Sequence, residues 1–207
     1  MQTTQSQPGD KRGPILDAAQ RVFADRGFHN ATVDLIADHA GVAKGTIYLY
    51  FKSKHELLAA LIEDRVSRLI NLIRRSAEEG PSALERLRAI VRVHFVFYEN
   101  NQEFMALLYG QLGHMATELE ERVTRVTEEL TAIIESSFAC GIDEGVFRPG
   151  DTRLLTFGLQ GMIHAVAFEW IMAGSVVPPD GVAEDVYRLF VEGAAVRDGQ
   201  GEGQDRR

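Results

Sequence analysis

A cation, a short hydroxyl and two phenols occur within seven residues of the chain and could all contact nucleic acid. They are Lys44, Thr46, Tyr48 and Tyr50. Such groups donate hydrogen bonds to phosphate oxygens, and short side chains can also reach base edges in the major groove. We predict that they lie on the outer face of a short helix, whose inner side carries Ile47 and Phe51 one turn apart.

The residues before this stretch would make it the second helix of a helix-turn-helix. A first helix opens after Thr32, whose hydroxyl can accept from the first free N–H groups. Ala37 is small where a second helix must pass close, and Gly41 allows the left-handed backbone of a tight turn. In this motif the second helix enters the major groove of DNA.

The segment Ser53-Lys54-His55-Glu56 has the pattern of a capping box and predicts the start of a third element. The first turn of a helix offers free N–H groups to a phosphate, and Lys54 adds a positive charge there. This helix start is therefore a second candidate for contact with the DNA backbone.

These residues resemble the TetR family of one-component transcriptional regulators, over about the first sixty positions. The matching segments are Ala18-Ala19-Gln20-Arg21-Val22-Phe23, Gly27-Phe28, Thr32, Gly41-Val42, Gly45-Thr46-Ile47-Tyr48, Tyr50-Phe51 and Ser53-Lys54. The family often has serine where this chain has Ala43, and alanine offers neither a helix cap nor a phosphate contact.

The resemblance implies a role for each matching position. Phosphate contacts are implied at Thr32, Tyr48, Tyr50 and Lys54, and positions at or near base edges at Lys44, Gly45 and Thr46. Packing is the alternative role of Tyr48. In a two-fold dimer the two recognition helices would lie about 34 Å apart, so the expected DNA partner is a double-stranded palindromic operator.

The charge distribution agrees with a DNA-binding head on an acidic body. The chain has 207 residues and a formal net charge of −8. Residues 1–75 hold 11 basic and 8 acidic side chains, whereas residues 76–207 hold 11 basic and 22 acidic ones. Such an asymmetry is a nucleic-acid signal in an otherwise acidic protein.

A cytoplasmic protein without membrane contact is expected. The first ten residues are polar and have no apolar run, unlike a signal peptide. The single cysteine, Cys140, excludes an internal disulfide. The segment Leu154–Met172 is apolar enough to raise the question of a membrane span, but it contains Gln160, His164 and Glu169, and a buried interface helix explains it better.

Apolar residues recur at helical spacing along the chain, and the pattern predicts an all-α fold of about nine helices. A disordered arm (1–10) precedes a three-helix helix-turn-helix domain (11–56). A ligand-binding and dimerisation body (57–197) and a disordered tail (198–207) follow. A long helix from 54 to about 78, too long to serve the head alone, links the head to the body. The body also contains a helix 152–173 with Asp151 as its cap.

The helix 152–173 is apolar or small at nearly every position, which predicts burial on all sides. In so small a body, one face is then expected to meet a second subunit and form a homodimer. The candidate interface residues are Gly158, Gly161, Ala165 and Phe190. The alternative is a helix that lies fully inside a monomer.

Aromatic and methionine side chains of the body are candidates for an effector pocket. They are Phe97, Phe104, Leu108, Met115, Phe138, Met162 and Phe168, and the alternative for each is ordinary core packing. Such a lining suits an apolar or amphipathic small molecule, acyl-type or drug-like. The body has no lysine, which disfavours a small polyanion.

No cofactor, metal or enzymatic activity is expected. The spacing of His94, His114, His164 and Glu169 matches no metal-ligand signature, and the chain has no Gly-x-Ser-x-Gly or HExxH motif. The leading hypothesis is a ligand-responsive DNA-binding regulator, a repressor released from its operator by the effector. The alternatives are an activator or an architectural DNA-binding protein without small-molecule control.

Overall fold

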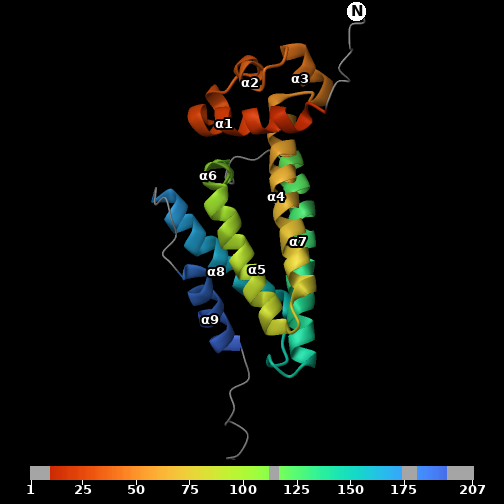
Figure 1. The fold of residues 1–207 in the computed structure, drawn as a ribbon, viewed down its shortest axis with the longest axis vertical. Coiled ribbons are helices and arrows are strands. Elements are labelled where there is room, and N and C mark those ends of the chain that lie inside the picture. The colour runs from red at the N-terminus through yellow and green to blue at the C-terminus, as the bar shows by residue number, and fades with distance from the viewer. Residues whose placement is uncertain (1–9, 112–116, 174–180, 195–207) are drawn as a thin grey trace, which may run out of the picture. The chain divides into compact units, whose positions relative to one another are not determined.

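The computed structural model describes residues 10–111, 117–173 and 181–194. These residues form nine helices and no strand, which confirms the expected all-α fold (Figure 1). The helices are α1 (Arg12–Asn30), α2 (Val33–Ala40), α3 (Lys44–Tyr50), α4 (Lys54–Glu79), α5 (Ala83–Asn100), α6 (Gln102–Gln111), α7 (Thr117–Asp143), α8 (Thr152–Met172) and α9 (Val182–Ala194). The expected arm, apart from Asp10, and the expected tail lie outside the described residues.

Local sequence signals set several of the helix ends. Gly27 has φ 71° and interrupts α1 with a kink. Gly41 has φ 64° and ψ 36° and ends α2 in the left-handed conformation that glycine tolerates best. The Asp151 carboxylate accepts from the N–H groups of Arg153 and Leu154 and caps α8 as predicted.

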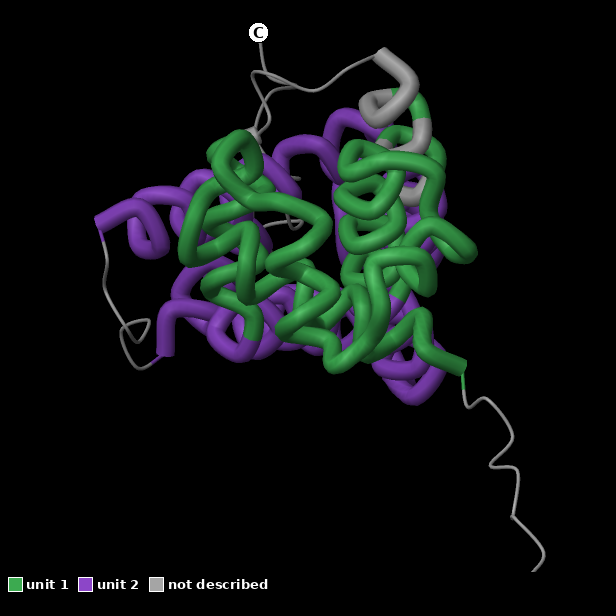
Figure 2. Tube along the Cα trace, turned by 90° about the horizontal axis from the view of Figure 1, so that it is seen from above, with its two compact units in different colours: residues 1–67, 101–126 green, residues 68–100, 127–207 purple. Residues whose placement is uncertain are grey.

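The chain divides into two compact units, shown in different colours in Figure 2. Unit 1 comprises residues 1–67 and 101–126, and unit 2 comprises residues 68–100 and 127–207. The division differs from the expected boundary at residue 56. Unit 1 takes in α6 and the first parts of α4 and α7, so both long helices contribute residues to each unit.

In unit 1, α1 packs on α2 and α6, and the core includes Ile15, Val22, Phe23 and Leu61. A buried arginine ties α1 to α4. The Arg65 guanidinium donates to Asp17 at 2.5 Å, to Asp64 at 2.9 Å and to Gln20 at 2.8 Å. A buried cation is tolerated when opposite charges and hydrogen bonds satisfy it in this way.

In unit 2, α5 packs against α8 and α9. The Phe138 ring of α7 lies 5.4 Å from that of Phe147 and 5.6 Å from that of Phe190, joining the end of α7 to α9. A Cβ at Gly141 would come within 2.4 Å of the Phe147 ring, so the close approach requires glycine.

The helix α8 has two different faces. Thr156, Leu159, Ile163, Ala167 and Trp170 are buried at helical spacing. A second stripe is exposed and includes Leu154, Phe157, Phe168 and Met172. Within the protomer α8 is therefore not buried on all sides, and the alternative of a fully internal helix is excluded.

Candidate functional site

The helix α3 presents an exposed face in unit 1. Ile47 and Phe51 are buried as predicted, so they anchor α3 and leave its other side free. Tyr48 is 47% exposed and Tyr50 is 38% exposed, while Lys44 is exposed at the start of the helix. The candidate base-reading and phosphate-contacting groups of α3 are thus accessible from solvent.

The turn before α3 is built as the sequence indicated. The Thr32 Oγ1 accepts from the Leu35 N–H at 3.2 Å and caps α2. Because a hydroxyl can accept and donate at once, this bond leaves the Thr32 hydrogen available to a phosphate oxygen. Ala43 precedes α3 and makes no side-chain cap, in keeping with its departure from the family pattern.

Two of the candidate side chains already contact the rest of unit 1. The Lys44 ammonium pairs with the Asp34 carboxylate of α2 at 2.8 Å, and the Asp34 hydrogen bond and charge raise the pKa of Lys44. Both side chains are exposed, so the pair is weak and a phosphate could replace Asp34. The backbone N–H of Lys11 donates to the Tyr50 hydroxyl at 3.3 Å, placing the first basic residue beside α3.

Lys54 begins α4 as expected, but its side chain is engaged within unit 1. Its ammonium donates to the carbonyl oxygens of Phe28 at 2.7 Å, His29 at 3.0 Å and Ala31 at 2.8 Å. It also lies over the Phe28 ring, 4.6 Å from the centroid. All three ammonium donors meet the chain that follows the Gly27 kink, so this geometry favours a bracing role over the predicted phosphate contact.

The capping box after α3 forms with one change. The Glu56 N–H donates to Ser53 Oγ at 3.1 Å, as in the standard box. The Glu56 carboxylate accepts at 2.6 Å from the N–H of Lys52 rather than from that of Ser53. The box therefore fixes the chain between α3 and α4, and with it the distance between the two candidate DNA-contacting elements.

Sequence reasoning missed Leu49. It is 84% exposed on the same outer face of α3 as Tyr48. At a DNA-binding surface, an exposed apolar side chain of this kind can contact a thymine methyl group. The available signal was that Leu49 lies two residues from each of Ile47 and Phe51, on the side of the helix away from the core.

The candidate pocket residues fall in both units. Phe97 and Phe138 are buried in unit 2, and Phe104 is buried in unit 1. Leu108 and Met162 are partly buried, Phe168 is exposed, and Met115 lies outside the described residues. Whether an effector touches them stays a prediction.

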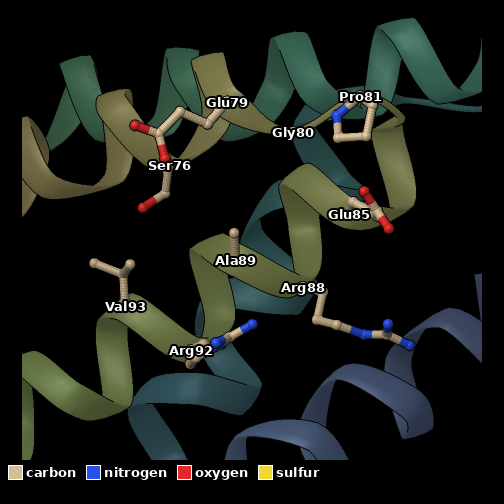
Figure 3. Close-up of a pocket in the computed structure, with 9 residues that line it drawn as sticks. All are labelled: Ser76, Glu79, Gly80, Pro81, Glu85, Arg88, Ala89, Arg92 and Val93. Carbon is tan, nitrogen blue, oxygen red and sulfur yellow. The ribbon is translucent and has the colours of Figure 1, made fainter.

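Unit 2 also has two hollows that sequence reasoning did not single out. The first has a volume of about 440 Å³, and its lining includes Ser76 and Glu79 of α4 and Arg88, Arg92 and Val93 of α5 (Figure 3). It is open to solvent and of mixed charge. The Arg88 guanidinium is engaged by Glu184 at 3.3 Å and by the Tyr187 ring at 4.8 Å.

The second hollow, of about 560 Å³, is lined by residues of α4, α5 and α7 that include Arg74, Arg86 and Ser137. Arg86 is already engaged, because its Nε donates to the Gly80 carbonyl at 2.9 Å and its Nη1 lies 3.5 Å from Cys140 Sγ. Neither hollow is lined by any of the seven candidate pocket residues.

Among the residues of the candidate dimer strip, Gly161 and Ala165 are exposed. Gly158 and Phe190 meet within the protomer, since a Cβ on Gly158 would lie 3.3 Å from the Phe190 ring. No cluster of three potential metal ligands occurs in the described parts of the chain. By length and composition alone, α8 could cross a membrane.

A capped helix, a left-handed glycine turn and a second helix with an exposed polar face define a helix-turn-helix DNA-binding protein. The family model for bacterial regulatory proteins of the tetR family matches residues 15–61. The family model for the tetracyclin repressor-like C-terminal domain matches residues 80–194. The chain belongs to the TetR family of transcriptional regulators, as its sequence motifs indicated, and it is not an enzyme.

Two relatives and one solved structure are similar to most of the chain. The transcriptional activator FasR of Mycolicibacterium smegmatis is 39% identical over 175 residues, covering 84% of this chain and 78% of FasR. The fatty acid metabolism regulator protein of Bacillus subtilis is 29% identical over 180 residues, covering 86% and 93%. The structure of FadR from Bacillus subtilis in complex with stearoyl-CoA has a TM-score of 0.82 at 28% identity, covering 87% of this chain and 98% of that chain.

Replacing Lys54 by methionine tests the bracing role. We expect the free energy of unfolding to fall by about 1–2 kcal/mol, because three carbonyl oxygens lose a charged donor. The salt dependence of DNA binding should stay the same, whereas loss of a phosphate contact would lower the slope by about one unit. Lys52→Met, at an exposed neighbouring lysine, is the stability control. An unchanged melting curve together with a reduced slope would restore the phosphate role.

Replacing Leu49 by alanine should weaken binding to the operator about fivefold and leave binding to random DNA unchanged. The reason is the loss of roughly 1 kcal/mol of apolar contact with the bases. Leu72→Ala removes an exposed leucine of α4 and serves as the matched control. Equal losses on both DNAs, measured by fluorescence anisotropy, would contradict a base contact.

Proposed function

We propose that this protein is a cytoplasmic, homodimeric repressor that releases a palindromic operator when it binds a long-chain acyl-CoA. The observation that carries the effector class is the likeness to a FadR structure in complex with stearoyl-CoA, which extends over 87% of this chain. The apolar and aromatic content of the body supports an effector with a long hydrocarbon chain.

The DNA-binding part of the proposal rests on the exposed face of α3. Lys44, Thr46 and Leu49 would face the bases, and Thr32 and the two tyrosines would meet phosphates. The basic balance of residues 1–75 supports this orientation, since positive charge steers the head towards DNA.

The dimer rests on the exposed apolar stripe of α8. Leu154 is 69% exposed and Phe157 is 50% exposed, and Phe168 and Met172 continue the same face. Contiguous exposed apolar surface on a folded protomer marks an interaction site. Gly161 and Ala165 lie on this stripe and would let a second α8 approach closely.

Coupling between effector and operator would run through α4. Its first half belongs to unit 1, where Lys54 and Arg65 bond it to α1, and its second half belongs to unit 2. An effector that binds unit 2 with different affinity in two arrangements of α4 would therefore change the affinity for DNA.

A second candidate is an activator that responds to the same class of effector. The specific observation in its favour is the 39% identity with FasR, which is named as a transcriptional activator. The two candidates share the DNA and effector sites and differ in the sign of the coupling or in the position of the operator.

Titration of an operator complex with stearoyl-CoA tests the proposal. The operator is first selected from random duplexes, and its affinity is then measured with stearoyl-CoA, CoA alone and stearate. We expect stearoyl-CoA to lower the affinity at least tenfold, within the roughly 5–150-fold range of allosteric couplings, and CoA alone to have no effect. Tight binding of stearoyl-CoA without any change in operator affinity would refute it, and an increase would favour the activator.

Replacing Phe157 by glutamate should convert the dimer into monomers. A carboxylate in the middle of an apolar interface is desolvated without a partner, which costs several kcal/mol. Val96→Glu is the matched control, because Val96 is 49% exposed on α5, outside the proposed interface. Sedimentation velocity separates the outcomes, and a Phe157→Glu dimer as tight as the wild type would place the interface elsewhere.

A further inference from the structure

A histidine inside unit 2 has a nitrogen atom without a partner in the part of the chain that the structure describes. His94 of α5 is fully buried, and its Nε2 has no hydrogen-bond partner among the described residues. Most buried polar groups in folded proteins are paired, because an unpaired one loses its hydration without replacement. The helical neighbours of His94 are apolar and buried, including Ile90, Val91 and Phe95.

The geometry identifies which chemical role the free nitrogen has. The Nδ1 of His94 lies 2.8 Å from the Ile90 carbonyl oxygen. A carbonyl oxygen only accepts, so Nδ1 must carry the hydrogen of this bond. Burial lowers the pKa of His94 to about 4, so the ring is neutral near pH 7. In the neutral ring the other nitrogen carries a lone pair, and Nε2 is therefore an acceptor.

The surroundings place this acceptor where α5 meets α8. The His94 ring lies 6.0 Å from the Tyr98 ring, and Tyr98 lies 6.3 Å from His164 of α8. Two further buried polar atoms without a partner in the described residues lie on α8, Thr156 Oγ1 and Trp170 Nε1. His94 thus lies at the packed pair of α5 and α8, in the unit proposed to sense the effector.

We propose that the Nε2 of His94 accepts a hydrogen bond from an N–H or O–H group of the effector. This inference rests on the proposed acyl-CoA response. An acyl chain has no donor, and a fatty acid ionised at neutral pH offers only acceptor oxygens. The pantetheine arm of an acyl-CoA carries amide N–H and hydroxyl groups. His94 thus selects an acyl thioester over the free fatty acid.

Two substitutions at residue 94 separate this role from plain packing. His94→Leu removes the acceptor, and His94→Gln restores one through its amide oxygen. Binding of stearoyl-CoA and of stearate is measured by calorimetry, and the melting temperature by circular dichroism. We expect His94→Leu to bind stearoyl-CoA roughly tenfold more weakly, because the effector donor is left unpaired. Its affinity for stearate should stay the same, and the glutamine variant should recover most of the loss.

The control is Thr156→Val, an isosteric change that removes another unpaired buried oxygen. Both His94→Leu and Thr156→Val should melt at the wild-type temperature or above, because each removes an unsatisfied polar atom. Only His94→Leu should lose affinity for stearoyl-CoA. A melting temperature well below the wild type for His94→Leu, with equal losses for both ligands, would mean that the histidine only packs the core.

Nitrogen-15 spectra of labelled histidine give a direct readout that needs no substitution. Addition of stearoyl-CoA should shift the His94 Nε2 resonance towards that of a hydrogen-bonded nitrogen, and stearate should leave it in place. A resonance that is already hydrogen-bonded in the free protein and does not move would identify a buried water as the partner and overturn the inference.

Failure of the proposed role of His94 can be distinguished from failure of the proposed function. If wild type and His94→Leu bind stearoyl-CoA equally well, the role of His94 is overturned and the proposed function stands. If the wild type binds no stearoyl-CoA, the proposed effector class falls and this inference falls with it.

Discussion

The attachment of α4 to α1 is the interaction on which the DNA-binding unit depends. Lys54 donates three hydrogen bonds to carbonyl groups at the end of α1, and Arg65 joins two carboxylates and an amide three turns further along α4. Short hydrogen bonds from a cation are directional, so several of them together fix both the position and the rotation of α4. The first half of α4 therefore moves with the head as one body.

In the proposed regulation, this attachment makes the long helix α4 the element that couples unit 1 to unit 2. A helix held at one end by a head and shared with a second unit can pass a rotation from one to the other, since its backbone hydrogen bonds resist bending. The destabilising features lie in unit 2. A buried nitrogen without a partner among the described residues, such as His94 Nε2, and an exposed apolar stripe on α8 lower the stability of the isolated protomer. In the proposed function, an effector and a second subunit would satisfy them.

Residue patterns predicted the helices and the helix-turn-helix because the signals are local. A capping hydroxyl at Thr32, a left-handed Gly41 and a capping box at Ser53 act on neighbours within four residues, so the sequence contains both partners of each bond. The same reasoning left open whether α8 meets a second subunit with one face or lies fully inside the protomer. Composition reports that a helix is apolar, but not which of its faces the same chain covers.

By itself, the sequence determined the family, the all-α fold and the position of the helix-turn-helix. Only the tertiary structure decided which side chains remain free to act. Lys54 finds its carbonyl partners 23 to 26 residues earlier in the chain, and Leu49 is left exposed because the core takes Ile47. His94 is buried, and the described residues leave one of its nitrogen atoms unpaired. Pairing and burial depend on neighbours that are distant in sequence, and the fold brings those neighbours together.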